Sequence, residues 1–307
     1  MVRYLIERFI YLFISILLII TLTFLMIKAL PGDPFTEEKA LAPEVFTKLK
    51  EHYNLSLSVG EQYLIYLRSV FSGDFGTSMV YPSRSVCDII LDSFPISAII
   101  GLQAIFVSAT GGILLGILLQ LNNQSRFSPI LTLTVLAIIS IPSFIAAPLL
   151  QYFFAIRWDV LPLAKWGSFS HTILPTLSLA AFPMAVIARL VDVKLSEVLK
   201  SDYITLAEAK GLSKFRILFR HALPNTLAPV VGYLGQTSAA ILTGSFVVER
   251  IFGIPGLGTW YVASILNRDY PLIMGTTLFY SLVLITLIFI SDLLYLALDP
   301  RLRRRYE

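Results

Sequence analysis

The stretch AEAKGLSKFRILFRHALPNTLAP, residues 207–229, decides the fold, because it places charge between two long apolar segments. The segments on either side, 172–191 and 226–248, are almost uninterruptedly apolar. Long apolar segments separated by short basic ones are typical of a protein that crosses a membrane several times. The charged and basic side chains of the stretch are Glu208, Lys210, Lys214, Arg216, Arg220 and His221.

The composition of the whole chain has the same character. Of its 307 residues, 56% are hydrophobic and 14% are charged, whereas about a quarter of the residues of a soluble domain are charged. The mean hydropathy is +0.77. A polytopic membrane protein fits this composition. The pI near 9.1 follows from basic residues between apolar segments and at the chain ends, so we expect no nucleic-acid partner.

Six segments are long and apolar enough to cross a bilayer. Backbone groups in lipid must be satisfied within the segment, so we expect six helices and an all-α integral membrane protein. The first segment would be about 33 Å long as a helix, longer than a signal-peptide core, and we expect it to be retained. Interior prolines (Pro142, Pro148, Pro175 and Pro183) predict kinks or breaks. The segments are 9–30, 96–121, 129–156, 172–191, 226–248 and 273–298.

The order of these segments predicts three parts. Residues 1–30 form an N-terminal transmembrane helix, 31–95 an extracytoplasmic insert, and 96–307 a core of five transmembrane helices with a cytoplasmic loop at 192–225. The distribution of Lys and Arg in short loops favours this orientation, with both termini in the cytoplasm. Within the insert, 43–55 and 60–71 have the pattern of short amphipathic helices; they form a docking surface or cap the outer mouth.

The chain lacks the motifs of common enzymes. It has no phosphate-binding loop and no nucleophile elbow, and His52, His171 and His221 are far apart without metal-ligand spacing. Cys87 is the single cysteine, which excludes an internal disulfide and a cysteine metal cluster. We therefore expect a transport subunit that binds no metal or cofactor itself. A membrane-embedded enzyme is a runner-up.

Two features inside the apolar segments have alternative interpretations. Gly112 and Gly116 have the spacing that lets helices approach closely, which indicates packing within the chain or against a partner. Asp292 lies inside the last segment, where an ionisable group is costly and is either functional or solvated near the helix end.

The charged stretch predicts two short helices that meet at a glycine. Asp202 is a candidate N-cap for a helix that runs to Lys210, and Gly211 suits the position after its end. Ser213 is a candidate cap for the second helix, which Pro224 would end. Its apolar stripe is Phe215, Leu218, Phe219 and Leu223. A loop that only sets topology needs neither corner nor stripe, so we favour a protein-docking elbow.

These residues resemble the conserved cytoplasmic loop of ABC-importer permeases, written E-A-A-x3-G-x9-I-x-L-P. Gly211, Leu223 and Pro224 match the pattern and Ala207 matches its second alanine, whereas Thr205, Leu206 and His221 depart from it. Three further segments are similar to the B-type permease of oligopeptide and dipeptide importers. They are LPGDP (30–34), GEQYLIYLRSVFSGDFGTSM (60–79) and VVERIFGIPGLGTWYVASILNRDYPLIMG (247–275).

The resemblance implies the type I importer fold in a bacterial inner membrane. It implies a second homologous permease, two ATPase subunits that bind ATP and Mg, and an extracytoplasmic peptide-binding protein. A permease for nickel chelates or another small solute has the same architecture; an ion-coupled carrier or channel should carry charges at the midplane. The residues expected to couple to an ATPase are Ala207, Glu208, Ala209, Lys210, Gly211, Leu212, Leu223 and Pro224. The candidates for the outer mouth or binding-protein contact are Phe252, Pro255, Gly256 and Trp260.

Overall fold

The structure is a computed structural model that describes residues 2–29, 43–123 and 125–298. These residues form helices joined by short loops, with one isolated β-bridge between Thr77 and Ser85. The π-helical turns are labelled η. The elements are α1 Val2–Ala29, α2 Pro43–His52, α3 Val59–Phe71, α4 Val86–Leu121, α5 Ser128–Ser140, α6 Ser143–Leu150, η1 Gln151–Arg157, α7 Ser170–Leu199, α8 Asp202–Ala209, α9 Lys214–Arg216, η2 Ile217–Ala222, α10 Leu223–Gly244, α11 Phe246–Phe252, α12 Leu257–Leu266 and α13 Tyr270–Leu298.

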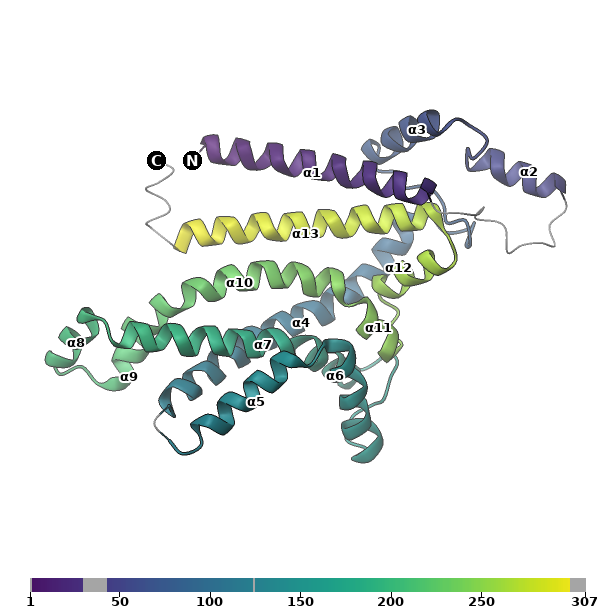
Figure 1. The fold of residues 1–307 in the computed structure, drawn as a ribbon. Helices are drawn as coiled ribbons and strands as arrows, with labels where there is room; N and C mark the ends of the chain where they lie inside the picture. Colours follow the sequence, from purple (N-terminus) through teal and green to yellow (C-terminus); the bar gives the residue numbers. More distant parts are fainter. Residues whose placement is uncertain (1, 30–42, 124, 299–307) are drawn as a thin grey trace.

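The long helices lie roughly along one direction (Figure 1). Within the described residues, four helices are long and apolar enough to span a membrane, and the number is six if each of two bent pairs is one span. The bent pairs are Ser128–Ser140 with Ser143–Arg157 and Lys214–Thr243 with Phe246–Phe252. This architecture agrees with the predicted all-α membrane protein.

The third expected span is broken, as its interior prolines predicted. Its two halves meet at an angle of 107°, and the break falls at Pro142, which has no amide to donate. Ile141, which precedes the proline, has the extended φ and ψ of −97° and 112°, as expected for that position. Helix α5 alone is about 20 Å long, too short to cross. By contrast, α7 continues as one helix through Pro175 and Pro183.

The core of the bundle is the close pair α4 and α7. A Cβ atom on Gly112 would lie 2.7 Å from the Met184 carbonyl oxygen, and one on Gly116 would lie 2.6 Å from the Ala188 carbonyl oxygen. Real Cβ atoms do not approach backbone this closely, so only glycine permits this separation. The predicted packing role of this spacing is confirmed, and the packing is within the chain.

Helix α13 lies between α1 and α10 (Figure 1). Arg8 of α1 forms an ion pair with Asp292 of α13, with 2.8 Å between Nη1 and Oδ2. The two side chains are 39% and 29% exposed. Asp292 therefore has a structural partner near the end of its helix.

The molecule has two distinct ends (Figure 1). Helices α8 and α9 lie at one end, which we call the elbow end; α1 also begins there and the described part of α13 finishes there. Helices α2, α3 and α12 lie at the opposite insert end. The two amphipathic helices expected in the insert are present as α2 and α3. Helix α4 begins at Val86, inside the segment that the sequence assigned to the insert.

Candidate functional site

The predicted glycine corner is present between α8 and α9. Gly211 has a φ of +74°, in the left-handed region that favours glycine. Its amide donates to the Glu208 carbonyl oxygen at 2.9 Å, and the Leu212 amide donates to the Ala207 carbonyl oxygen at 3.3 Å. These two bonds form a Schellman motif, which satisfies carbonyls at the end of α8. We call residues 201–225 the elbow.

The first helix of the elbow starts one residue earlier than its predicted cap implied. Helix α7 ends at Leu199, and Ser201, not Asp202, occupies the N-cap of α8. Ser201 has an extended backbone, with φ −80° and ψ 151°, which breaks the helical path. The break turns α8 into a separate short helix.

The second helix of the elbow begins as predicted and ends differently. The Ser213 hydroxyl accepts a hydrogen bond from the Arg216 amide at 3.4 Å, which confirms the cap. Pro224 does not end the helix, because α10 continues directly from the π turn η2 and passes through it. Residues Lys214–Thr243 therefore run as one rod from the elbow into the bundle.

The π turn η2 changes which residues of this rod face the protein. Ile217 and Ala222, five positions apart, are buried, as the i to i+5 geometry of a π turn allows. They pack against Ile204 and Ala207 of α8. The predicted stripe is therefore divided: Leu218 and Leu223 are partly buried, whereas Phe215 and Phe219 are exposed.

The coupling candidates divide in the same way. Ala207 is buried and Leu212 and Leu223 are partly buried, so these three side chains hold the elbow together. Asn225 adds a bond from its Nδ2 to the Tyr203 hydroxyl at 2.9 Å. The remaining candidates are exposed and available to a partner: Glu208, Ala209, Lys210, Gly211 and Pro224.

Exposed apolar side chains gather on the elbow. Phe215 is 72% exposed and Leu206 is 56% exposed. Phe219 contacts Phe215 with its ring tilted by 39° and a centroid distance of 4.5 Å, and Tyr203 is also exposed. We call these four residues the elbow patch. Exposed apolar side chains on both helices of the elbow are typical of an interaction site. Nothing in the sequence pattern indicated Tyr203.

The four outer-mouth candidates lie at the insert end in different environments. Phe252 and Gly256 are buried, and Pro255 is exposed. Trp260 is partly buried and contacts Tyr81 edge to face, with 5.3 Å between ring centroids. Pro255 is therefore the candidate with the most accessible surface in this chain.

A buried carboxylate that the sequence analysis missed, Glu249, joins the start of α11 to the start of α12. Glu249 is 1% exposed. Its Oε1 accepts a hydrogen bond from the Ser245 hydroxyl at 2.6 Å, and its Oε2 accepts one from the Thr259 amide at 3.3 Å. The Glu249 carboxylate therefore lies at the N-terminus of α12, where the backbone amides of the first turn favour a negative charge. A Cβ on Gly258 would lie 2.8 Å from Oε2, so the small residue makes room for the carboxylate.

A second buried carboxylate joins the insert to the last helix. Asp269 is 1% exposed and accepts hydrogen bonds from the Ser78 hydroxyl and from the Met79 amide, the latter at 3.1 Å. The neighbouring Tyr53 hydroxyl donates to the Ser78 carbonyl oxygen at 3.0 Å. Burial raises the pKa of Tyr53, which keeps this donor protonated.

The described residues contain no group of three or more His, Cys, Asp or Glu side chains placed to hold a metal. The structure has an exposed elbow at one end and a hydrogen-bonded corner around Glu249 at the other. The helical run Lys214–Thr243 lies between them. Such an arrangement can transmit movement along the bundle.

Comparisons with known proteins identify the family of this chain. Residues 112–304 match the family described as binding-protein-dependent transport system inner membrane component, and residues 1–101 match its N-terminal counterpart. The chain is 47% identical to the dipeptide transport system permease protein DppB of Bacillus subtilis, covering 99% of this chain and 98% of the relative. It is 38% identical to the oligopeptide transport system permease protein OppB of Haemophilus influenzae, covering 99% of this chain and 100% of that relative.

A solved structure supports the fold independently. The inward-facing MetNI methionine ABC transporter has a chain similar to this one, with a TM-score of 0.57 and 19% identity, covering 69% of this chain and 96% of that chain. The chain therefore belongs to the family of binding-protein-dependent transport system inner membrane components.

Proposed function

We propose that this chain is the permease subunit of an ATP-driven peptide importer. The observation that carries the proposal is the 47% identity to a dipeptide permease over 99% of the chain. The exposed elbow adds a structural reason, since a subunit without its own nucleotide site needs a surface on which an ATPase can act. In this proposal the elbow and both chain ends lie in the cytoplasm, and the insert lies on the outer face.

The elbow then docks on an ATPase subunit. The elbow patch supplies apolar contact area, and Glu208 and Lys210 supply charges at its edge. The ATPase binds ATP and Mg, and this chain hydrolyses nothing. Closure of the ATPase pair drives the spans between inward-open and outward-open states only if the elbow makes different contacts in the two states.

The rod from Lys214 to Thr243 carries this movement. Ile204 and Ala207 of α8 pack in one buried cluster with Ile217 and Ala222 of the rod. Displacement of α8 therefore displaces the rod. A second homologous permease completes the path, and a peptide-binding protein delivers the substrate at the insert end. Pro255 and its neighbours are our candidates for that contact.

The ion pair of Asp292 argues against an ion-coupled carrier. Such a carrier needs a charged site near the middle of the membrane, whereas Asp292 pairs with Arg8 near the elbow end of α13 (Figure 1). Its charge is already balanced.

The test is to purify the tagged chain from native membranes, identify its partners by mass spectrometry, and reconstitute the complex. We expect ATPase subunits to copurify and labelled dipeptide uptake to require ATP together with the binding protein. Uptake by the chain alone, or a complex that imports no peptide, would contradict the proposal.

A further inference from the structure

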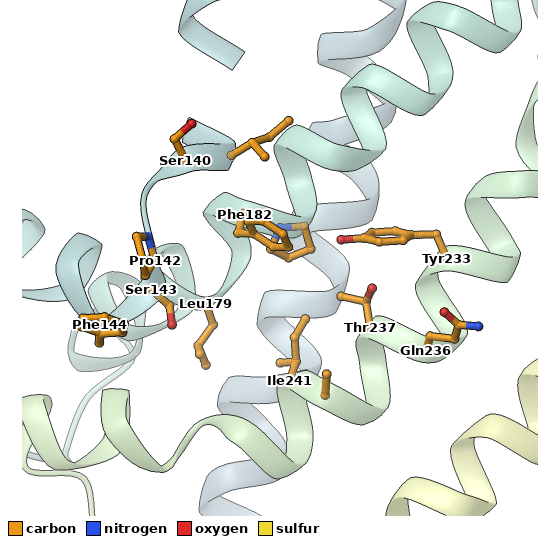
Figure 2. Close-up of a pocket in the computed structure, with 13 residues that line it drawn as sticks. Ser140, Pro142, Ser143, Phe144, Leu179, Phe182, Tyr233, Gln236, Thr237 and Ile241 are labelled. Carbon is orange, nitrogen blue, oxygen red and sulfur yellow. The ribbon is translucent and has the colours of Figure 1, made fainter. Parts of the chain in front are cut away.

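A cavity of about 690 Å³ opens where α5 breaks from α6. Its walls come from this break, from α7 and from α10 (Figure 2). Figure 2 shows the Tyr233 hydroxyl of α10 pointing towards Phe182 of α7, across the space between the two helices. The volume of the cavity falls within the range of about 300–1,000 Å³ that is usual for small-ligand sites.

In the proposed orientation, with α7 crossing the bilayer, the cavity lies at the depth of the hydrocarbon core. Phe182 is in the middle of the apolar part of α7, and the break is about 20 Å along α5 from its start. Sites at this depth, built on an interrupted helix, are where membrane transporters hold their substrates.

Most of the lining is apolar, but a few of its groups are unsuited to lipid. The first amides of α6, at Ser143 and Phe144, receive no side-chain cap, and Pro142 interrupts the helical bonding. Irregular backbone at membrane depth persists only where protein covers it or where it lines a water-filled space. The Gln236 side chain is exposed, and a primary amide facing hydrocarbon tails is costly. These groups indicate a water-filled wall of a path.

The lining also indicates what the path accepts. None of its side chains is charged. Polar groups of the lining lie beside an apolar wall that includes Phe182; they are the side chains of Ser143, Tyr233, Gln236 and Thr237. Ser140 adds an acceptor only, because its hydroxyl already donates to the Leu136 carbonyl oxygen at 3.0 Å. Neutral donors and acceptors complement peptide-bond amides, and an apolar wall accepts side chains of varied shape without fixing one of them.

We propose that this cavity is a transit subsite that holds an uncharged peptide side chain against Phe182 while neutral groups of α5, α6 and α10 hydrogen-bond the peptide backbone. The inference rests on the proposed function and adds to it. It assigns part of the substrate preference to the permease itself, since the size of the cavity limits the bulk of the side chain that passes.

Water access is the first test, made on the complete complex in proteoliposomes. Ser143→Cys is introduced together with Cys87→Ser, and a water-soluble methanethiosulfonate reagent is the probe. We expect the thiol to be modified, and diphenylalanine supplied through the binding protein to protect it during ATP turnover. Thr134→Cys, exposed on α5 outside the lining, is the control that should stay unmodified. An unmodified thiol in the Ser143→Cys variant means that lipid or another subunit covers the cavity, and it overturns the inference.

Cavity filling is the second test. We expect Thr237→Trp to lower uptake of diphenylalanine about tenfold relative to dialanine, because pocket size discriminates on this scale. The matched variant Thr110→Trp, on an exposed position of α4 outside the lining, should leave the ratio unchanged. Equal loss for both peptides would contradict a size-limited subsite.

The two tests separate this inference from the proposed function. Peptide uptake with an unlabelled thiol refutes only the subsite, whereas a complex without any peptide uptake refutes the proposed function. If Thr237→Trp fails to assemble, the labelling result alone decides the inference.

Discussion

Ser78 and Asp269 are 191 residues apart in the chain, and the Ser78 hydroxyl donates a hydrogen bond to the Asp269 carboxylate. The same carboxylate accepts from the Leu272 amide at 3.4 Å, in the first turn of α13. One buried side chain therefore fixes the insert to the start of the last span.

We expect Asp269→Ala to loosen this attachment. The change leaves the Ser78 hydroxyl and the Met79 amide without their acceptor, and each unsatisfied buried group costs about 1–3 kcal/mol. Thermal unfolding in detergent and limited proteolysis of the insert measure the effect. Asp92→Ala is the control, because Asp92 is exposed in a 3.4 Å pair with Arg84, and such pairs contribute little. Equal stability of the two variants would contradict the anchoring role.

We expect Gly211→Val to uncouple ATP hydrolysis from transport. No neighbouring atom lies within 4 Å of a Cβ at this position, so the effect comes from the backbone, whose left-handed conformation costs about 1–2 kcal/mol for a residue with a side chain. The measurement is ATPase stimulation by loaded binding protein in the reconstituted complex. Gly60→Val is the matched control and should keep the stimulation. Gly60 also has no atom within 4 Å of an added Cβ, but its backbone is not left-handed. Unchanged stimulation in Gly211→Val would exclude the corner as a coupling element.

We expect Gly112→Ala to separate α4 from α7. The added methyl group meets the Met184 carbonyl oxygen and the Ile187 side chain at 2.7 Å, and overpacking of this kind costs about 1–3 kcal/mol. Thermal unfolding of the purified chain should occur at a lower temperature. Gly167→Ala, whose nearest contact would be an ordinary 3.6 Å to His171, should unfold as the parent does.

We expect Asp292→Asn to leave ATP-driven uptake intact. The pair with Arg8 lies near one end of α13 and asparagine keeps the shape of the side chain, so we expect the variant to remain folded. Uptake is measured with and without a proton or sodium gradient. Abolished uptake in a stable variant, or uptake that follows the gradient, would favour an ion-coupled carrier.

The sequence predicted the features that depend on neighbouring residues. Apolar length located the spans, the positive φ expected at Gly211 is present, and Ser213 caps as its position implies. Each of these follows from local preferences of the backbone, which a short stretch of sequence contains.

The features that were missed depend on geometry or on distant partners. Proline at 142 predicted an interruption, but not the 107° turn that follows it. The π turn altered the buried face of the elbow, because a helical period of 3.6 cannot anticipate an inserted residue. In the sequence, Glu249 and Asp269 are only charged residues near apolar segments. The donors to the Asp269 carboxylate come from residues 78 and 79, far away in the chain, so the local sequence could not indicate its role.

The unbroken run from Lys214 to Thr243 has a mechanical consequence. Thirty residues of helix, with a π turn and two prolines (Pro224 and Pro229) along it, extend about 45 Å, so a tilt imposed on Phe215 can reach the far end through backbone that stays helical. The corner around Glu249 can therefore change position without any segment having to refold.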